Sequence, residues 1–187
     1  MSPRSDTQAI LRHWREAVPD DRLAHLVKDA TRALVRALQM RLAEHAVSFG
    51  HWTFLRILWE GDRLTQRELS DRAGVMEPTT FSALKAMERL GYIRRRKFAG
   101  DRKKIYVLLT AKGRALRDRL VPLAEDVNRI AVRGVRPAAI AATRGVLLAI
   151  IENMDRDEHT ADMKMPSTRA LAKLTKKKPG KRPRRKP

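Results

Sequence analysis

Apolar residues recur at helical spacing over most of the chain, and three of these stretches are long. The first runs from residue 22 to about residue 48, and the apolar residues of its face are Leu23, Leu26, Val27, Ala30, Leu34, Ala37, Leu38 and Leu42. Two more long stretches follow Thr110 and Pro137, with Gly134 between them. A shorter stripe around Trp14 predicts a short helix within residues 1–20. Such long apolar faces must be covered, either by the same chain or by a second subunit.

The segment between the long helices is divided by strong helix-start and helix-stop signals. Residues 51–60 predict one helix, and the capping-box pattern of residues 65–68 starts a second helix that stops at Gly74. Pro78 lies in the tolerated first turn of a third helix, which Gly91 ends. A short helix joined to another by a tight turn is the helix-turn-helix arrangement, whose second helix can enter the major groove of DNA.

The third helix of this segment has an apolar side and a polar side. Phe81, Leu84 and Met87 follow one another at intervals of three residues and are predicted to face the core. The residues expected to contact DNA lie in the first turns and are small or basic: Pro78, Thr79, Thr80, Ser82 and Lys85. Hydroxyl groups can donate to or accept from base edges, and small side chains let the backbone approach closely. An ordinary capped helix has the same pattern, so this helix alone leaves the assignment open.

Two strands are predicted after the third helix, at residues 92–98 and 104–109, with a turn signal at residues 99–101. The residues of this hairpin expected at DNA are Arg94, Arg96, Asp101, Arg102, Lys103 and Lys104. A hairpin with a basic tip can lie along a minor groove, where cations meet concentrated negative potential. A run of charges is usually a solvated face, but its place directly after a helix-turn-helix favours contact with DNA.

The charge of the chain points in the same direction. Its formal net charge is +20, of which residues 51–110 carry +6 and residues 164–187 carry +11. Basic surfaces attract polyanions, with nucleic acid first and acidic membranes second. The last segment holds eleven Lys or Arg residues, no acidic residue and several prolines, so it is predicted to be disordered and to add nonspecific phosphate contacts.

Other classes of function find little support. The chain has no cysteine, which excludes disulfides and thiolate metal sites. It has no apolar signal core and no run of about 18 apolar residues, so we expect no membrane partner and a cytoplasmic, nucleoid-associated protein. Neither HExxH, GxSxG nor a phosphate-binding loop occurs, which predicts that the chain is not an enzyme and holds no cofactor. Glu44, His45 and His51 are the weak alternative of a metal-sensing site, and we expect no metal there.

Three groups of residues resemble the MarR family of bacterial regulators. They are Leu64-Thr65-Gln66-Arg67-Glu68-Leu69, then Gly91-Tyr92-Ile93, and then Asp101 followed by Val107-Leu108-Leu109-Thr110-Ala111-Lys112-Gly113. The most specific part is the wing pattern. It begins with Asp-x-Arg, continues with a strand, and ends with Leu-Thr-x-x-Gly. The resemblance covers about residues 21 to 157. One position departs from it, because Lys103 stands where the family has its wing arginine, and Arg102 lies one residue earlier. Lysine keeps the charge but loses the planar fork of a guanidinium.

The resemblance implies a homodimer, in which the helical regions at both ends form a platform that carries two winged lobes. It also implies a small, aromatic or anionic effector where the platform meets each lobe, and the residues at the matching positions are His51, Trp52 and Arg56. The alternative is that Trp52 belongs to the core and Arg56 to a surface ion pair. The N-terminal helix is expected either to pack on the platform or to cover the effector pocket.

These observations predict a mainly α fold with a small β-hairpin wing (α+β), in which a winged helix-turn-helix lobe sits on an all-helical dimerisation platform. The predicted segments are an N-terminal extension (1–20), a dimerisation helix (21–50), the DNA-binding lobe (51–110), further dimerisation helices (111–157) and a basic tail (158–187). The predicted function is that of a ligand-responsive transcriptional regulator, a repressor that binds a pseudo-palindromic operator in double-stranded DNA and is released by its effector. The alternative is an architectural protein that coats nucleic acid through its basic tail.

Overall fold

The computed structural model describes residues 6–16, 23–98 and 101–160, and the side chains of residue 6 and residues 101–103 lie outside this description. The chain divides into two compact units, residues 1–133 and residues 134–187. The predicted basic tail after residue 160 lies outside the described residues.

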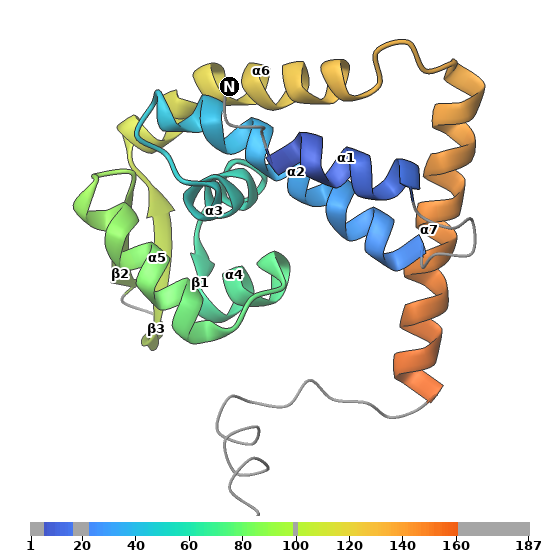
Figure 1. Cartoon of the computed structure of the whole chain (residues 1–187). Coiled ribbons are helices and arrows are strands. Elements are labelled where there is room, and N and C mark those ends of the chain that lie inside the picture. Colours follow the sequence, from blue (N-terminus) through green and yellow to red (C-terminus); the bar gives the residue numbers. More distant parts are fainter. Residues whose placement is uncertain (1–5, 17–22, 99–100, 161–187) are drawn as a thin grey trace, which may run out of the picture. The chain divides into compact units, whose positions relative to one another are not determined.

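The described part of the first unit is mostly helical, with one small sheet (Figure 1). In chain order its elements are α1 (Asp6–Glu16), α2 (Leu23–Ala43), α3 (Phe49–Glu60), β1 (Leu64–Thr65), α4 (Gln66–Ala73), α5 (Glu77–Arg89), β2 (Ile93–Phe98), β3 (Asp101–Leu109) and α6 (Ala111–Ala131). The sheet is antiparallel, in the strand order β1-β3-β2. The predicted class, mainly α with a β-hairpin wing, is confirmed.

The core of this unit forms where the short helices, the sheet and the long helices α2 and α6 meet. Its fully buried side chains are almost all aliphatic, as expected for a chain with 5% aromatic residues: Leu42, Leu55, Leu58, Leu69, Leu84, Met87, Ile93 and Leu120. Helix α2 packs against α6 and α3 through its C-terminal half, where Leu38 and Leu42 are buried. Leu23, Leu26 and Leu34, which precede these two residues in the helix, are exposed.

The N-terminal helix α1 lies on α2. The indole nitrogen Nε1 of Trp14 donates a hydrogen bond to Oδ2 of Asp29, at 3.0 Å. Of the two predicted positions for this segment, packing on the long helix is therefore the observed one.

Helix α2 ends about five residues earlier than the sequence predicts. Its last residue is Ala43, and Ala46 has the left-handed backbone conformation, with φ of 57°. The amide of Val47 donates to the carbonyl of Leu42 at 3.1 Å, which is the hydrogen bond that closes a Schellman C-cap. Glycine is the usual residue at such a position, so an alanine there gave no stop signal.

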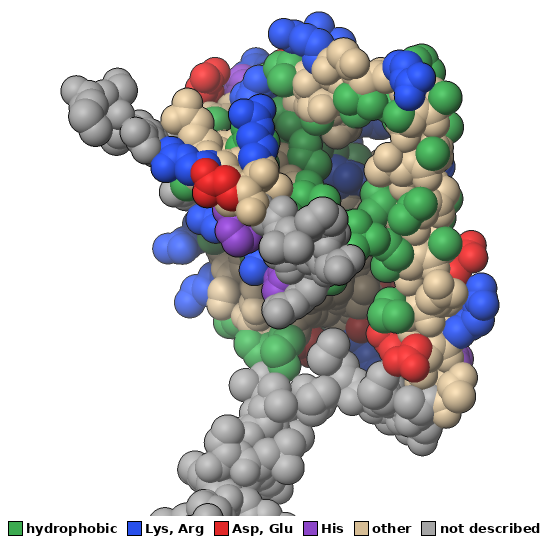
Figure 2. Space-filling model, turned by 45° about the vertical axis from the view of Figure 1, so that its right-hand side comes forward, with side chains coloured by type: hydrophobic (Ala, Val, Ile, Leu, Met, Phe, Trp, Pro, Cys, Tyr) green, Lys and Arg blue, Asp and Glu red, His purple; other side chains and the backbone are tan. Residues whose placement is uncertain are grey.

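The second unit contains helix α7 (Pro137–Thr160) among the residues that the structure describes. None of its residues is buried, and hydrophobic side chains are visible on its surface (Figure 2). By length and composition α7 could cross a membrane, with a mean hydropathy of 1.2 over an 18-residue window. The sequence of α7 is still not a continuous apolar run of about 18 residues, because Arg144 and Glu152 interrupt it.

Candidate nucleic-acid interface

Helices α4 and α5 form a helix-turn-helix, and hydrogen bonds fix both the start of α4 and the turn between the two helices. The Thr65 hydroxyl accepts from the Glu68 amide at 3.3 Å, and the Glu68 carboxylate accepts from the Thr65 amide at 2.7 Å, which completes the predicted capping box. Gly74 ends α4 with φ of 62°, and the Val75 amide donates to the Ser70 carbonyl. The backbone thus turns sharply before α5 begins at Glu77.

Thr80 holds the two helices together and does not face a ligand. Its side chain has no exposed surface, and its Oγ1 lies 2.8 Å from the Ser70 hydroxyl of α4 in a buried hydrogen bond. The assignment of Thr80 as a DNA contact was therefore wrong. The predicted core position of Phe81 was also wrong, since this side chain is 48% exposed, while Thr80, Leu84 and Met87 form the buried side of α5.

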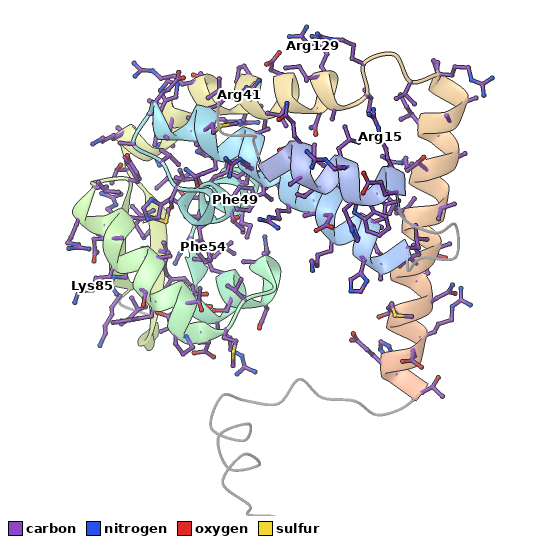
Figure 3. The ribbon with its side chains drawn as sticks, in the orientation of Figure 1. Arg15, Arg41, Phe49, Phe54, Lys85 and Arg129 are labelled. Carbon is purple, nitrogen blue, oxygen red and sulfur yellow. The ribbon has the colours of Figure 1, made fainter. Side chains whose placement is uncertain are left out.

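The outer side of α5 carries the other predicted contact residues. Pro78, Thr79, Ser82 and Lys85 are all exposed. The Lys85 side chain points away from the body of the lobe (Figure 3). The Ser82 hydroxyl donates to the Pro78 carbonyl at 3.0 Å, so its lone pairs remain open to a donor. This side of α5 offers hydroxyl groups, an ammonium group and a phenyl ring to a partner.

The wing consists of β2 and β3, which pair antiparallel with a bulge between Arg96 and Phe98. The side chains of Arg94, Arg96 and Lys104 are exposed. Asp101 is the first residue of β3, but its side chain and those of Arg102 and Lys103 lie outside the described residues. Which of the two cations enters a groove therefore stays a prediction.

Arg95 ties the wing to helix α5. Its guanidinium donates to Glu88 Oε2 from Nε at 2.9 Å and from Nη2 at 2.6 Å, and its amide donates to Oε1 at 3.1 Å. The hydrogen bonds from the Arg95 side chain are the main reason that the pKa of Glu88 lies below its ordinary value. Its neighbours Arg94 and Arg96 are exposed. In this run of basic residues, Arg95 therefore holds the wing to α5, while Arg94 and Arg96 are open to a partner.

Arg63 is a further cation at the wing, and the sequence did not predict its position there. The guanidinium carbon of Arg63 is 4.0 Å from the centroid of the Phe98 ring and 5.5 Å from that of Tyr106. The two rings contact each other edge to face, at 5.5 Å between centroids. Arg63 has φ of 67°, and its amide donates to Asp62 Oδ1 at 2.9 Å. The sequence could not predict this contact, because it joins a loop residue to strands that lie more than 30 residues further along the chain.

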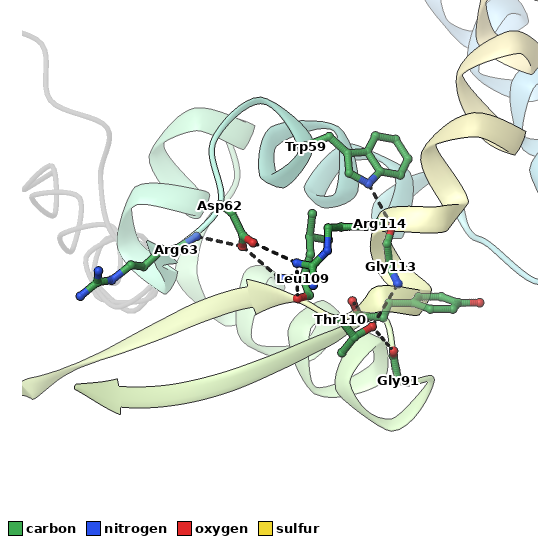
Figure 4. Close-up of polar contacts among 9 residues, drawn as sticks. Trp59, Asp62, Arg63, Gly91, Leu109, Thr110, Gly113 and Arg114 are labelled. Carbon is green, nitrogen blue, oxygen red and sulfur yellow. Dashed lines mark hydrogen bonds and ion pairs between the residues drawn. The ribbon is translucent and has the colours of Figure 1, made fainter. Parts of the chain in front are cut away.

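The base of the wing is locked to α6 by the residues of the Leu-Thr-x-x-Gly pattern (Figure 4). The Thr110 hydroxyl donates to the Gly91 carbonyl at 2.6 Å and accepts from the Gly113 amide at 3.0 Å. The indole Nε1 of Trp59 donates to the Gly113 carbonyl at 3.0 Å, and Asp62 Oδ1 accepts from the Leu109 amide at 2.9 Å. The pattern thus fixes the position of the wing relative to α3 and α6 and is not itself a ligand site.

Two cavities lie beside α3, where the predicted effector residues are found. The larger, of about 560 Å³, is mainly apolar and is lined from α3, α4 and α5 by residues that include Phe49, Trp52, Phe54, Arg56, Arg72, Thr79 and Ala83. Figure 3 labels Phe49 and Phe54, which both belong to α3. The smaller, of about 320 Å³, lies between α3 and α6 and shares Trp52 and Arg56.

The predicted effector residues differ in their surroundings. The Trp52 ring is buried and contacts Trp59 edge to face, and Arg56 is exposed and pairs with Glu60 at 3.8 Å. His51 lines neither of these cavities. Its Nδ1 is buried and has no hydrogen-bond partner among the residues that the structure describes, and burial lowers the pKa of His51. The part of the chain that the structure describes holds no group of three or more His, Cys, Asp or Glu suited to a metal ion.

The elements described above define a winged helix-turn-helix protein. The sequence model of the MarR family matches residues 47–105 of the chain. The chain is 31% identical over 109 residues to the HTH-type transcriptional regulator TtmR of Methylorubrum extorquens, a match that covers 58% of this chain and 56% of that protein. It is 29% identical over 109 residues to the homoprotocatechuate degradative operon repressor of Escherichia coli. This match covers 58% of this chain and 74% of that protein.

A solved structure gives the same picture for the fold. BpsR of Bordetella bronchiseptica, whose structure concerns the regulation of DNA binding by 6-hydroxynicotinic acid, superposes with a TM-score of 0.64. It is 20% identical, over 72% of this chain and 96% of that one. The chain is thus similar to the MarR family of winged helix-turn-helix regulators, and the family model matches its DNA-binding lobe. The proteins that it resembles are transcriptional regulators and not enzymes.

Proposed function

We propose that this protein is a ligand-responsive transcriptional repressor that binds a pseudo-palindromic site in double-stranded DNA as a homodimer. The observation that carries the proposal is the shared surface of α5 and the wing. Thr79, Ser82 and Lys85 are exposed on α5, and Arg95 fixes that helix to a strand whose Arg94 and Arg96 are exposed. A helix of this kind reads base edges in the major groove, while the wing contacts the adjacent backbone or minor groove.

Exposed apolar side chains support the dimer. On α2 they are Leu23, Leu26 and Leu34, and on α7 they are Val146, Leu147, Leu148, Ile151 and Met154. Helices that expose this much apolar surface to water are expected to bury it against another chain. A second subunit explains the apolarity of α7 without a membrane, and it would present two winged lobes to successive major grooves. The proposed site of action is the cytoplasm, where the DNA lies.

The cavity of about 560 Å³ supports the effector. It has the size of a pocket for a small molecule, and Arg56 and Arg72 in its lining suit an anionic aromatic compound. Thr79 and Ala83 of α5 belong to the same lining, so a ligand that fills it meets the helix proposed to read DNA. Such a ligand releases DNA only if it binds the DNA-free arrangement more tightly.

The test of the DNA claim is selection of double-stranded sites from a randomised library by the full chain, followed by titration of the selected site. We expect two similar half-sites whose centres are roughly 10 base pairs, or a multiple, apart. Removal of residues 164–187 is expected to lower affinity and its salt dependence while the site preference remains. Two results would favour the architectural alternative. One is binding without any sequence preference, and the other is loss of all DNA binding when residues 164–187 are removed.

The effector claim is tested with 6-hydroxynicotinic acid as the probe. We expect it to weaken binding to the selected site by at least about fivefold. Arg56→Gln removes a cation from the cavity and is expected to abolish this response while DNA affinity without the probe stays the same. An equal response in wild type and variant would place the effector elsewhere.

Sedimentation of the full chain tests the dimer. Ile151→Glu, at a side chain that is 64% exposed, is expected to shift the protein toward the monomer. Arg156→Glu, at an exposed residue on the opposite face of the same helix, serves as the control. A monomeric wild type at micromolar concentration would contradict the proposal.

A further inference from the structure

Phe81 is a large apolar residue at the border of the polar outer side of α5. Its side chain is 48% exposed, whereas Thr80 before it and Leu84 after it have no exposed surface. At about 100° per residue, Phe81 points to the flank of the helix between the buried side and the outer side that carries Ser82 and Lys85. About half of the ring is therefore open to a partner that contacts the outer side.

The ring has a defined neighbour on the wing. The guanidinium carbon of Arg95 lies 5.9 Å from the ring centroid, and Arg95 is held in place by its hydrogen bonds to Glu88 on the same helix. This flank of α5 thus combines a phenyl ring and a guanidinium that are tied to one another and to the wing. The ring lies in the second turn of α5, the end of the helix whose residues reach base edges in helix-turn-helix proteins.

We propose that Phe81 determines sequence specificity by contact with the 5-methyl group of a thymine in the major groove, an inference that rests on the proposed function. The thymine methyl is the apolar group on the major-groove edge, and a phenyl ring can distinguish it but cannot replace a hydrogen bond. The exposed neighbours Thr79, Ser82 and Lys85 supply hydrogen bonds to other bases. Phe81 adds the apolar element that these residues lack.

The experiment uses the full chain and the DNA site selected from the randomised library. Each thymine of one half-site is replaced in turn by deoxyuridine, which removes only the methyl group. We expect one position at which wild-type affinity falls by about three- to fivefold per half-site, the effect of burying one methyl group. Phe81→Ala is expected to bind the thymine and deoxyuridine forms of that position equally.

Two variants act as controls. Phe81→Leu keeps an apolar side chain and is expected to retain part of the preference for thymine. Leu90→Ala removes another exposed apolar side chain at the end of the same helix and is expected to leave the preference unchanged. If Phe81→Ala shows the wild-type ratio at every thymine, the inference is overturned. If no preferred site is selected at all, the proposed function fails before Phe81 is tested.

Discussion

The backbone of Gly113 lies against the carbonyl group of Tyr92 so closely that a Cβ at Gly113 would be 2.0 Å from the carbonyl oxygen. Gly113 is buried in the first turn of α6, and the same carbonyl accepts a hydrogen bond from the Thr110 amide at 3.0 Å. The end of the wing and the start of α6 therefore approach each other at a distance that any side chain would prevent.

Gly113→Ala is expected to destabilise the protein strongly. The obstacle is backbone, which cannot rotate away as a side chain can, so the helix must move and its bonds to Thr110 and Trp59 must stretch. We expect a loss of about 3 kcal/mol in the free energy of unfolding, at the upper end for overpacked sites. Urea denaturation followed by circular dichroism measures it.

The matched control is Gly50→Ala in the first turn of α3. A Cβ there meets only the Ser48 hydroxyl at 3.9 Å, an ordinary contact. This variant is expected to be as stable as the wild type or more stable, because alanine favours helix. Equal stability of the Gly113 variant and the wild type would mean that the wing and α6 are not packed as described.

Several features of the fold could be predicted because they have local causes. The capping box of Thr65 and Glu68, and the left-handed glycines Gly74 and Gly91, fix the ends of helices through bonds between near neighbours. The end of α2 has the same hydrogen-bond pattern, but Ala46 occupies the left-handed position, so the sequence carried no mark of it. Strand β1 was missed because it has two residues and exists only through its pairing with β3.

Only part of the candidate site could be predicted, because the rest depends on contacts between residues that are far apart in the sequence. The spacing of Phe81, Leu84 and Met87 fits a helical face, but so does that of Thr80, Leu84 and Met87, and packing against Ser70 decided between them. A hydroxyl can be buried when it has a partner, and sequence spacing does not show the partner. The contact of Arg63 with Phe98 was likewise beyond prediction because it depends on how the loop folds over the wing.

Ala46→Gly is expected to stabilise the protein. A residue with a Cβ loses free energy in the left-handed conformation, and glycine does not. With φ of 57° at Ala46, we expect a gain of about 1 kcal/mol in the free energy of unfolding. Ala115→Gly, at an exposed position within α6, serves as the control and is expected to lose about 1 kcal/mol. Effects of the same sign would contradict the assigned C-cap.

Thr80→Val tests the reassignment of Thr80 from DNA contact to core. The substitution keeps the shape and removes the hydroxyl that bonds to Ser70. We expect a loss of roughly 1 to 2 kcal/mol in the free energy of unfolding and unchanged affinity for the selected DNA site. Ser82→Ala, at the exposed neighbour, is expected to do the opposite, with stability kept and affinity reduced. A large loss of affinity in folded Thr80→Val protein would restore the original assignment.

The ion pair of Glu88 and Arg95 is expected to make stability depend on pH. Because the folded protein holds the pKa of Glu88 below its unfolded value of about 4.3, the pair stabilises fully above that value. The contribution is lost as the pH falls through the folded pKa. Glu88→Gln is therefore expected to narrow the difference in urea midpoint between neutral pH and roughly pH 3.

Arg95→Gln is expected to narrow the same difference, because Glu88 then has no guanidinium to lower its pKa. The double variant is expected to match either single variant, since both changes remove one interaction. An undiminished difference in Glu88→Gln would show that other carboxylates account for the acid sensitivity.

Arg63→Gly is expected to weaken DNA binding without loss of stability. Glycine suits the left-handed backbone at φ of 67°, so the variant removes the charge without straining the chain. If Arg63 contacts a phosphate, the slope of log affinity against log salt concentration is expected to fall in magnitude by about 1. Titration of the selected site at several salt concentrations measures this slope.

Two further variants separate the charge of Arg63 from its position. Arg63→Lys keeps a cation and is expected to retain most of the salt slope, with lower affinity because the planar contact with Phe98 is lost. Phe98→Leu removes the ring beneath the guanidinium and is expected to resemble Arg63→Lys, since a freely moving arginine loses more entropy on binding. A wild-type slope in Arg63→Gly would show that this cation supports the wing and does not meet DNA.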